Sequence, residues 1–318
     1  MSSPGPSFAP GMKAVAYETF GGAEVLRVVD RPEPHVGPDS VLVKVVAVGL
    51  NPVDYKIREG YLRGLIDTHL PAVPAWDVAG VVVKPGLDTP ELEAGDEVLA
   101  YARKDVVSDG TLAEYVSVPV RTAAKKPAGL SFEQAAALPL AGLTALQTVR
   151  RSGLGAGSTV LVHAAAGGVG SIATQLAVHA GARVVGTASP GNHDYLRGLG
   201  AEPVAYGDGL VAAARALAPG GFDVVLDYVG GAAVDTAPDL LAEGGTIVSI
   251  ADARARTELG GQYVWVRPDP AGLAELADLA ARGVLKVEIA QTFDLDHAAD
   301  AYRALETGHT RGKIVVTV

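Results

Sequence analysis

Hydrophobic positions in the first part of the chain occur in short runs that are separated by Gly, Pro and Asp. These runs cover residues 12–17, 41–48, 78–83, 97–100 and 112–118. Short apolar segments bounded by turn-forming residues are typical of β-strands. The sequence therefore predicts an irregular, β-rich unit between residue 12 and about residue 126.

The pattern changes at Ser131, where strands begin to alternate with helices. Ser131 and Gln134 have the spacing of a capping box and precede the helix-prone residues 135–138. An apolar strand over 159–166 is followed by apolar residues at helical spacing from Val169 to Ala180. Further strands are expected at 183–187, 222–227 and 245–250. This alternation predicts a doubly wound α/β unit with a parallel sheet.

The end of the chain carries two amphipathic helices, over 273–282 and 297–307, and then a strand over 312–318. No parallel neighbour is left for this strand to follow, so we expect it to return to the first unit. The predicted domains are therefore residues 12–126 together with 267–318, and residues 127–266.

Composition and charge exclude several classes of function and partner. The 318 residues include no cysteine, and 26 Lys and Arg stand against 36 Asp and Glu, for a net charge of −10. The missing cysteines exclude disulfides, a thiol nucleophile and Cys-based zinc sites. The negative charge disfavours nucleic acid as a partner, and no apolar run approaches the roughly 18 residues of a membrane span. Residues 1–11 resemble a loose tail and not a signal peptide, so a cytoplasmic protein is expected.

The strongest chemical signal is the segment H-A-A-A-G-G-V-G at residues 163–170, between a strand and a helix. The pattern G-x-G-x-x-G maps onto Ala165, Gly167 and Gly170, with alanine in the first place. Gly167 lets the backbone approach a pyrophosphate, Gly170 permits close helix–strand packing, and the amides from Gly168 and Val169 onward face the anion. A dinucleotide site is predicted, and the alternative is a small-residue turn needed only for packing.

The end of the next strand indicates which dinucleotide is bound. It has the sequence Gly-Thr-Ala-Ser at 186–189, without the acidic residue that usually holds the ribose of NAD. Ser189 leaves space and a donor for a 2′-phosphate, and Asn192, His193 and Arg197 add further donors. NADP(H) is favoured. In the alternative, Ser189 only begins a turn with the following Pro-Gly.

The segment N-P-V-D-Y-K at 51–56 allows two interpretations. In the first, the segment is only a helix start, because Asn51 is a good N-cap, Pro52 suits the first helical position and Asp54 complements the helix dipole. In the functional interpretation, Asn51 and Lys56 hold a substrate carbonyl, and Tyr55 forms an aromatic wall or donates a proton. Trp76-Asp77 is interpreted as core and turn, and the seven scattered histidines predict no metal site.

Seven segments, in this order, resemble those of zinc-free medium-chain dehydrogenases/reductases. They are G-L-N-P-V-D-Y-K at 49–56, P-A-W-D-V-A-G-V-V at 74–82, G-D-E-V at 95–98, G-T-L-A-E-Y-V at 110–116, L-P-L-A-G-L-T-A at 138–145, A-A-A-G-G-V-G at 164–170 and G-K-I-V-V at 312–316. The chain is most similar to the NADPH:quinone oxidoreductase, or zeta-crystallin-like, branch and its enone and alkenal reductase relatives. The resemblance implies a GroES-like catalytic domain, a Rossmann domain and a homodimer joined along an edge strand at 262–266.

The resemblance also implies roles for single residues. Asn51 would lie beside the nicotinamide, Lys56 near the substrate oxygen, and Thr144 at the nicotinamide end. Residues 167–170 would take the pyrophosphate, Ser189 the 2′-phosphate with His193 or Tyr195, and Lys313 would face the cofactor or merely flank the last strand. The implied activity is zinc-independent hydride transfer from NADPH to a quinone. The alternatives are an enone or alkenal reductase, and an NADPH-binding sensor or structural protein with little activity.

Overall fold

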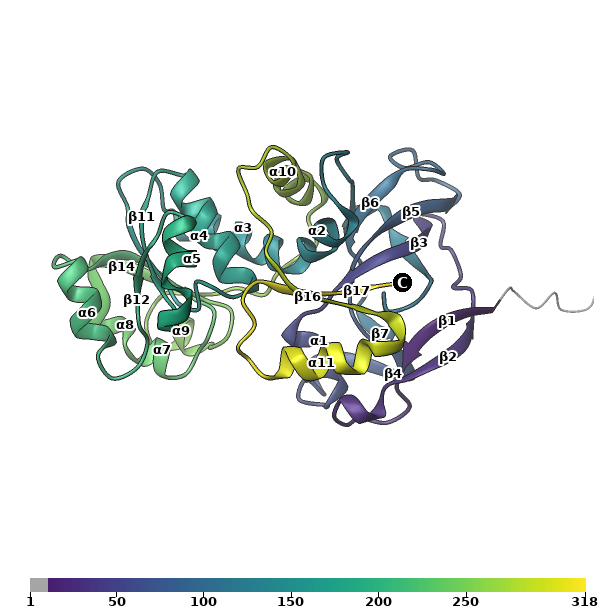
Figure 1. Ribbon diagram of the computed structural model, residues 1–318, viewed down its shortest axis with the longest axis horizontal. Coiled ribbons are helices and arrows are strands. Elements are labelled where there is room, and N and C mark those ends of the chain that lie inside the picture. The colour runs from purple at the N-terminus through teal and green to yellow at the C-terminus, as the bar shows by residue number, and fades with distance from the viewer. Residues whose placement is uncertain (1–10) are drawn as a thin grey trace, which may run out of the picture.

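A computed structural model describes residues 11–318 and shows two lobes, each built on one large sheet (Figure 1). The sequence-predicted tail over residues 1–11 lies outside the described residues, apart from Gly11. The fold is mixed α/β, with a GroES-like lobe and a Rossmann lobe, as the sequence predicts.

The sheet of the first lobe takes its strands from both ends of the chain. Its order is β16-β17-β3-β5-β6-β9, and β8 also pairs with β3. The return of the last strand is confirmed, because β17 lies antiparallel to β3, with Val316 opposite Val48. The expectation that this strand has no parallel neighbour is wrong, because β17 also pairs in parallel with β16. The strands are β3 (Ser40–Gly49), β5 (Asp77–Pro85), β6 (Glu97–Tyr101), β8 (Tyr115–Pro119), β9 (Ala123–Lys125), β16 (Ile289–Asp294) and β17 (Lys313–Thr317).

Two small sheets complete the strands of this lobe. β1 (Gly11–Ala16) pairs with β2 (Arg27–Pro32), and β4 (Asp67–Val73) pairs with β7 (Val106–Asp109). Short 3-10 helices over Ala23–Val25 and Val120–Thr122 connect neighbouring strands.

The sheet of the second lobe has six parallel strands in the order β12-β11-β10-β13-β14-β15. Val160, Leu161 and Val162 in β10 are completely buried, as expected for a central strand with helices on both faces. Strand order reverses between β10 and β13, and in open α/β sheets ligands bind beyond the carboxyl ends of the strands at this point. The strands are β10 (Thr159–Val162), β11 (Arg183–Thr187), β12 (Glu202–Val204), β13 (Phe222–Asp227), β14 (Leu241–Ser249) and β15 (Gln262–Tyr263).

Helices cover both sheets and the region where the lobes meet. Figure 1 places α1 and α11 in the first lobe, α4 to α9 in the second, and α2, α3 and α10 where the lobes meet. In α2, Ala135, Ala136 and Ala137 are fully buried, because small side chains allow this helix to contact β3 and β17 closely. The helices are α1 (Pro52–Arg58), α2 (Phe132–Ala137), α3 (Pro139–Ser152), α4 (Gly168–His179), α5 (His193–Gly198), α6 (Leu210–Leu217), α7 (Ala232–Asp235), α8 (Ala237–Leu240), α9 (Arg254–Thr257), α10 (Pro270–Ala281) and α11 (Ala298–Glu306), with 3-10 turns at Pro190–Asn192 and Leu295–His297.

Three predicted strands are shorter than expected. The strand predicted over 159–166 ends at Val162, because the chain then turns toward α4. The strand predicted over 112–118 begins at Tyr115, since the carbonyl of Leu112 accepts a hydrogen bond from Val15 of β1. The edge strand predicted over 262–266 contains only Gln262 and Tyr263, and the following residues run toward the first lobe. Within residues 11–318, no helix is long and apolar enough to span a bilayer.

Candidate active site

The glycine segment forms a tight turn between β10 and α4, at the point where strand order reverses. The amide of Ala165 donates to the carbonyl of Thr187 at 3.0 Å, and the amide of Ala164 donates to the Thr187 hydroxyl at 3.1 Å. These bonds fasten the turn to the end of β11. The left-handed residue of the turn is Ala164, with φ of 52°, one position before the alanine that the pattern puts in the first glycine place.

The glycines of this turn differ in whether the fold itself requires glycine at their position. A Cβ on Gly170 would lie 2.1 Å from the carbonyl oxygen of Ala164, so the packing of α4 against the turn requires glycine. Gly167 has an ordinary extended backbone, and a Cβ there would meet only one atom within 4 Å, the same oxygen at 3.3 Å. The open side of Gly167 and the amides at the α4 N-terminus therefore form a cradle that fits a dinucleotide pyrophosphate.

The residues predicted to select NADP(H) lie together after β11. The Nδ2 of Asn192 donates to the Ser189 hydroxyl at 3.2 Å, and a ring nitrogen of His193 lies 3.4 Å from the carbonyl of Ala188. Arg197 forms an exposed ion pair with Asp194 at 2.6 Å. Ser189 does begin a turn, as the alternative required, and its partly buried side chain still belongs to a group of polar side chains with Asn192 and His193.

Thr144 is buried in the second turn of α3. Its hydroxyl donates to the carbonyl of Leu140 at 2.7 Å, and the next hydroxyl on this face, that of Thr148, lies 2.7 Å from the hydroxyl of Tyr228. Tyr228 follows β13, so α3 is bonded to the strand end beside the reversal of strand order.

Asn51 lies at the centre of a buried polar network. It begins α1, and its amide donates to the carboxylate of Asp54 at 2.8 Å, as the interpretation of a capped helix start predicts. Its side-chain Nδ2 donates to Asp77 at 2.9 Å, and its Oδ1 accepts a hydrogen bond from Lys313. Both ends of the Asn51 amide are therefore bound within the protein.

Asp77 and Lys313 extend this network to the second lobe. One carboxylate oxygen of Asp77 accepts a hydrogen bond from the amide of Leu140 at 2.9 Å, at the start of α3. The Nζ of Lys313 donates to the carbonyl of Leu50 at 2.7 Å and lies 3.9 Å from the carboxylate of Asp77. The Lys313 stem lies so close to Gly168 that a Cβ on Gly168 would be 2.8 Å from its Cδ. The network thus connects α1, β5, α3 and β17 with the glycine turn.

Burial disfavours the charges of this network. Removal from water raises the pKa of Asp77 to about 6, although Lys313 and hydrogen bonds from Asn51 and Leu140 oppose the rise. It raises the pKa of Asp54 to about 7, with Asp77 adding repulsion. The pKa of Lys313 is lowered by burial against the attraction of both carboxylates. Lys313 is the first residue of β17 and is 5% exposed, so its charge is buried beside the glycine turn.

The other two predicted catalytic residues lie outside this network. Lys56 is exposed on α1 and forms no ion pair with another residue of 11–318. Tyr55 is half-buried.

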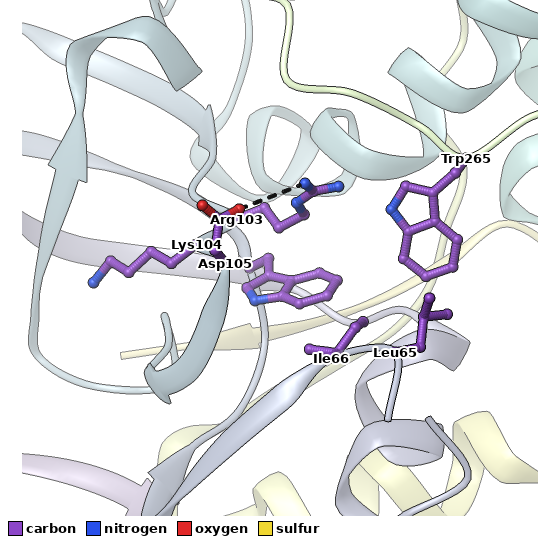
Figure 2. A pocket seen from close by; sticks show the side chains of 7 residues that line it. Leu65, Ile66, Arg103, Lys104, Asp105 and Trp265 are labelled. Atoms are coloured by element: carbon purple, nitrogen blue, oxygen red, sulfur yellow. Dashed lines mark ion pairs between the residues drawn. The ribbon is translucent and has the colours of Figure 1, made fainter. Parts of the chain in front are cut away.

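A cavity of about 200 Å³ opens between the lobes, and its lining includes residues to which sequence analysis gave no role in binding (Figure 2). Trp76 was interpreted as core, whereas Trp265 and Arg103 were not singled out. Both tryptophans of the chain line this cavity, one from each side of the boundary predicted at residue 266. Because the chain has only two tryptophans, their rarity is the feature of the sequence that could have indicated a binding role. The lining residues are Leu65, Ile66, Trp76, Arg103, Lys104, Asp105 and Trp265.

Metal ligands are missing from the described part of the chain. Within residues 11–318, no three His, Cys, Asp or Glu side chains are grouped as a metal site would need. The chain has no cysteine, which removes every Cys-based zinc ligand. The donor set does not fit a catalytic zinc.

A GroES-like lobe, a Rossmann lobe with a glycine turn at its strand reversal, and a cavity between them define a nucleotide-dependent oxidoreductase fold. The family model described as alcohol dehydrogenase GroES-like domain matches residues 37–128, and the one described as zinc-binding dehydrogenase matches residues 199–316. With these matches and the relatives described next, the chain belongs to the medium-chain dehydrogenase/reductase family.

Relatives in this family include reductases of two acceptor classes. The chain is 38% identical to the 2-methylene-furan-3-one reductase of Solanum lycopersicum over 314 residues, covering 96% of this chain and 79% of that protein. It is also 38% identical to the chloroplastic NADPH-dependent alkenal/one oxidoreductase of Arabidopsis thaliana over 315 residues, with the same coverage. The structure of the quinone oxidoreductase from Coxiella burnetii matches with a TM-score of 0.87 and 36% identity, covering 97% of this chain and all of that one.

Proposed function

We propose that this protein is a zinc-independent, NADPH-dependent reductase that transfers a hydride to a quinone bound between the lobes. The observation that carries the proposal is the glycine turn, open at Gly167 and joined through Lys313, Asn51 and Asp77 to Trp76 of the cavity. One continuous set of contacts thus leads from the pyrophosphate cradle to the acceptor cavity.

On the cofactor side, residues 167–170 would hold the pyrophosphate through backbone amides at the α4 N-terminus. Ser189, Asn192 and His193 would donate to a 2′-phosphate, and Thr144 would lie toward the nicotinamide. NADPH supplies the hydride from C4 of its nicotinamide. The protein contributes orientation, which in well-aligned reactions supplies on the order of 7–11 kcal/mol of the barrier.

On the acceptor side, the family resemblance gives Lys56 the role of stabilising the oxygen that gains negative charge. Its ammonium forms no ion pair within residues 11–318, although Lys56 is not among the residues that line the cavity. Tyr55 would supply a proton, because a tyrosine hydroxyl is protonated at neutral pH even at its ordinary pKa of about 10, which burial raises further here. Asn51, with both ends of its amide bound, would hold Lys313 and Asp77 in place beside the glycine turn.

The same site supports an α,β-unsaturated carbonyl as the alternative acceptor. The hydride would then enter at the β-carbon while Lys56 stabilises the enolate oxygen, and the proton would follow at the α-carbon. The two relatives at 38% identity carry names of this class, which favours it over the remaining alternative, a sensor that binds NADPH with little turnover.

The test is NADPH oxidation by the purified protein with 1,4-naphthoquinone or a medium-chain enone, with NADH as the control cofactor. Rapid NADPH-selective turnover supports the proposal, and the ratio of kcat/KM for the two acceptors assigns the class. NADPH binding without turnover of either acceptor would contradict the reductase proposal and favour a sensor.

We also propose a homodimer joined at the edge of the Rossmann sheet. β15 is the outer strand of this sheet and has a free edge within the described chain. Light scattering after size exclusion should give twice the 32.4 kDa chain mass, and a monomer would contradict this part of the proposal.

A further inference from the structure

The cavity between the lobes combines aromatic walls with an incompletely paired cation. We propose that it selects acceptors in which a planar ring carries an anionic group, and that Arg103 is the residue that selects the anion. This inference rests on the proposed reductase function and names its substrate class.

The walls fit one ring or a small fused pair. Trp76 is only 4% exposed, and the edge contact of its ring with Tyr101, at 6.0 Å between centroids and 71° between planes, fixes its orientation. Leu65 and Ile66 add aliphatic surface. An apolar cavity of about 150 Å³ holds benzene, so the volume of about 200 Å³ accommodates a substituted ring. Stacking against indole favours planar molecules.

The cation lies where it can meet a substituent of that ring. Figure 2 shows the Arg103 guanidinium on one side of the cavity near Trp265, with Leu65 and Ile66 on the other side. The Arg103 side chain is 26% exposed, and its shortest ion-pair distance within residues 11–318 is 4.0 Å, to the fully exposed carboxylate of Asp105. Its hydrogen bond to the carbonyl of Val266 is long, at 3.4 Å.

The Tyr101 hydroxyl also lies beside the guanidinium, and the donors of Arg103 that these contacts do not use remain available to a ligand. A guanidinium carries five N–H donors in a planar fork that matches a carboxylate or sulfonate. Lys104 contributes to the cavity lining, but its ammonium is engaged elsewhere: its Nζ donates to the carbonyl of Asp109 at 3.0 Å, and Figure 2 shows this end of the side chain directed away from the cavity. Lys104 is therefore the matched control for Arg103, with the same charge, an adjacent position and a different direction.

The test uses two probes of nearly equal shape, 4-nitrobenzoate and the neutral 4-nitrobenzamide. Both tryptophans of the chain line the cavity, so quenching of intrinsic fluorescence by the nitroarene reports its occupancy directly. We expect the wild type to bind the anion about tenfold more tightly than the amide. Arg103→Gln should reduce this ratio to about one, and Lys104→Gln should leave it within about twofold of wild type.

Further variants keep the test decisive if Arg103→Gln does not fold. Arg103→Lys retains the charge without the fork and should give an intermediate ratio. Asp105→Asn removes the distant carboxylate and should raise the ratio by about twofold. A ratio unchanged in the Arg103 variants, an equal fall in Lys104→Gln, or the absence of quenching by both probes would overturn the inference.

The same probes separate this inference from the proposed function. 4-Nitrobenzoate should inhibit NADPH oxidation competitively with 1,4-naphthoquinone in the wild type, and less effectively in Arg103→Gln. If no acceptor is reduced while the anion still binds through Arg103, the reductase proposal fails and the anion site stands. If quinone reduction proceeds and the ratio of probe affinities does not depend on Arg103, the inference alone fails.

Discussion

Gly167 and Gly170 differ in what the fold requires of them, and replacing each with alanine separates cofactor binding from folding. Gly167 has an extended backbone with φ of −77°, which any residue adopts, and a Cβ there meets one oxygen at 3.3 Å. Gly167→Ala should therefore change the free energy of unfolding by less than about 1 kcal/mol. The new methyl group would occupy the open side of the cradle and weaken NADPH binding about tenfold or more, roughly 1.4 kcal/mol.

Gly170→Ala should instead reduce the stability of the fold more than Gly167→Ala does. Its Cβ would lie 2.1 Å from the Ala164 carbonyl oxygen, which is held by the amide of Gly167, so the start of α4 must move by roughly 1 Å to reach a tolerable distance. Overpacking of this kind costs about 1–3 kcal/mol, and each kcal/mol lowers Tm by about 2–4 °C in domains of this size.

Thermal unfolding without cofactor gives the stability of each variant, and calorimetric titration with NADPH at a temperature where both are folded gives the affinity. Wild-type affinity in Gly167→Ala would refute the pyrophosphate assignment. Wild-type stability in Gly170→Ala would refute the packing argument.

Three further predictions concern charged residues. Burial raises the pKa of Asp54 to about 7 from an ordinary 3.8. Between these two pH values the unfolded chain releases the Asp54 proton more readily than the folded protein, so the free energy of unfolding falls as pH rises. The stability of Asp54→Asn relative to wild type, measured by urea unfolding, should therefore increase as pH rises from 4 to 7.5, by a total on the order of 4 kcal/mol. Lys313→Met leaves the buried Asp77 without its cation and should cost about 3–5 kcal/mol, more at pH 8 than at pH 5.5. Lys56→Ala should lower kcat for the preferred acceptor about tenfold or more without changing the Kd of NADPH, as steady-state kinetics and titration would show.

Each of these predictions has a defined contrary result. Parallel pH profiles for wild type and Asp54→Asn would contradict the raised pKa. A loss in Lys313→Met that does not change with pH, or that Asp77→Asn fails to relieve in the double variant, would contradict the buried pair. Unaltered kinetics of Lys56→Ala with both acceptor classes would return Lys56 to an exposed helix position.

Local patterns in the sequence were sufficient for many of the elements, although they missed the strands β2, β4, β7, β9, β12 and β16. β11 and β13 have the predicted bounds, because short apolar runs between turn formers depend on neighbouring residues only. The capped start of α2 at Ser131 and the place of the glycine turn between a strand and a helix are confirmed for the same reason.

Single residues inside these elements were harder to predict. The left-handed position of the turn is Ala164 and not the alanine of the pattern, because bonds to Thr187 on the next strand decide how the turn closes. The strand that contains Gln262 is shorter than predicted, because the residues after it run to the first lobe, where Arg103 donates a hydrogen bond to the carbonyl of Val266.

The sequence by itself thus determined the two-lobed α/β architecture, the family resemblance and the position of the nucleotide turn. Only the tertiary structure decided that Lys313 lies buried against Asn51, 262 positions away in the chain, and that Trp76 and Trp265 line one cavity with Arg103. Periodicity and capping signals extend over a few residues, whereas these contacts arise when strands from the two ends of the chain pair in one sheet and the lobes meet.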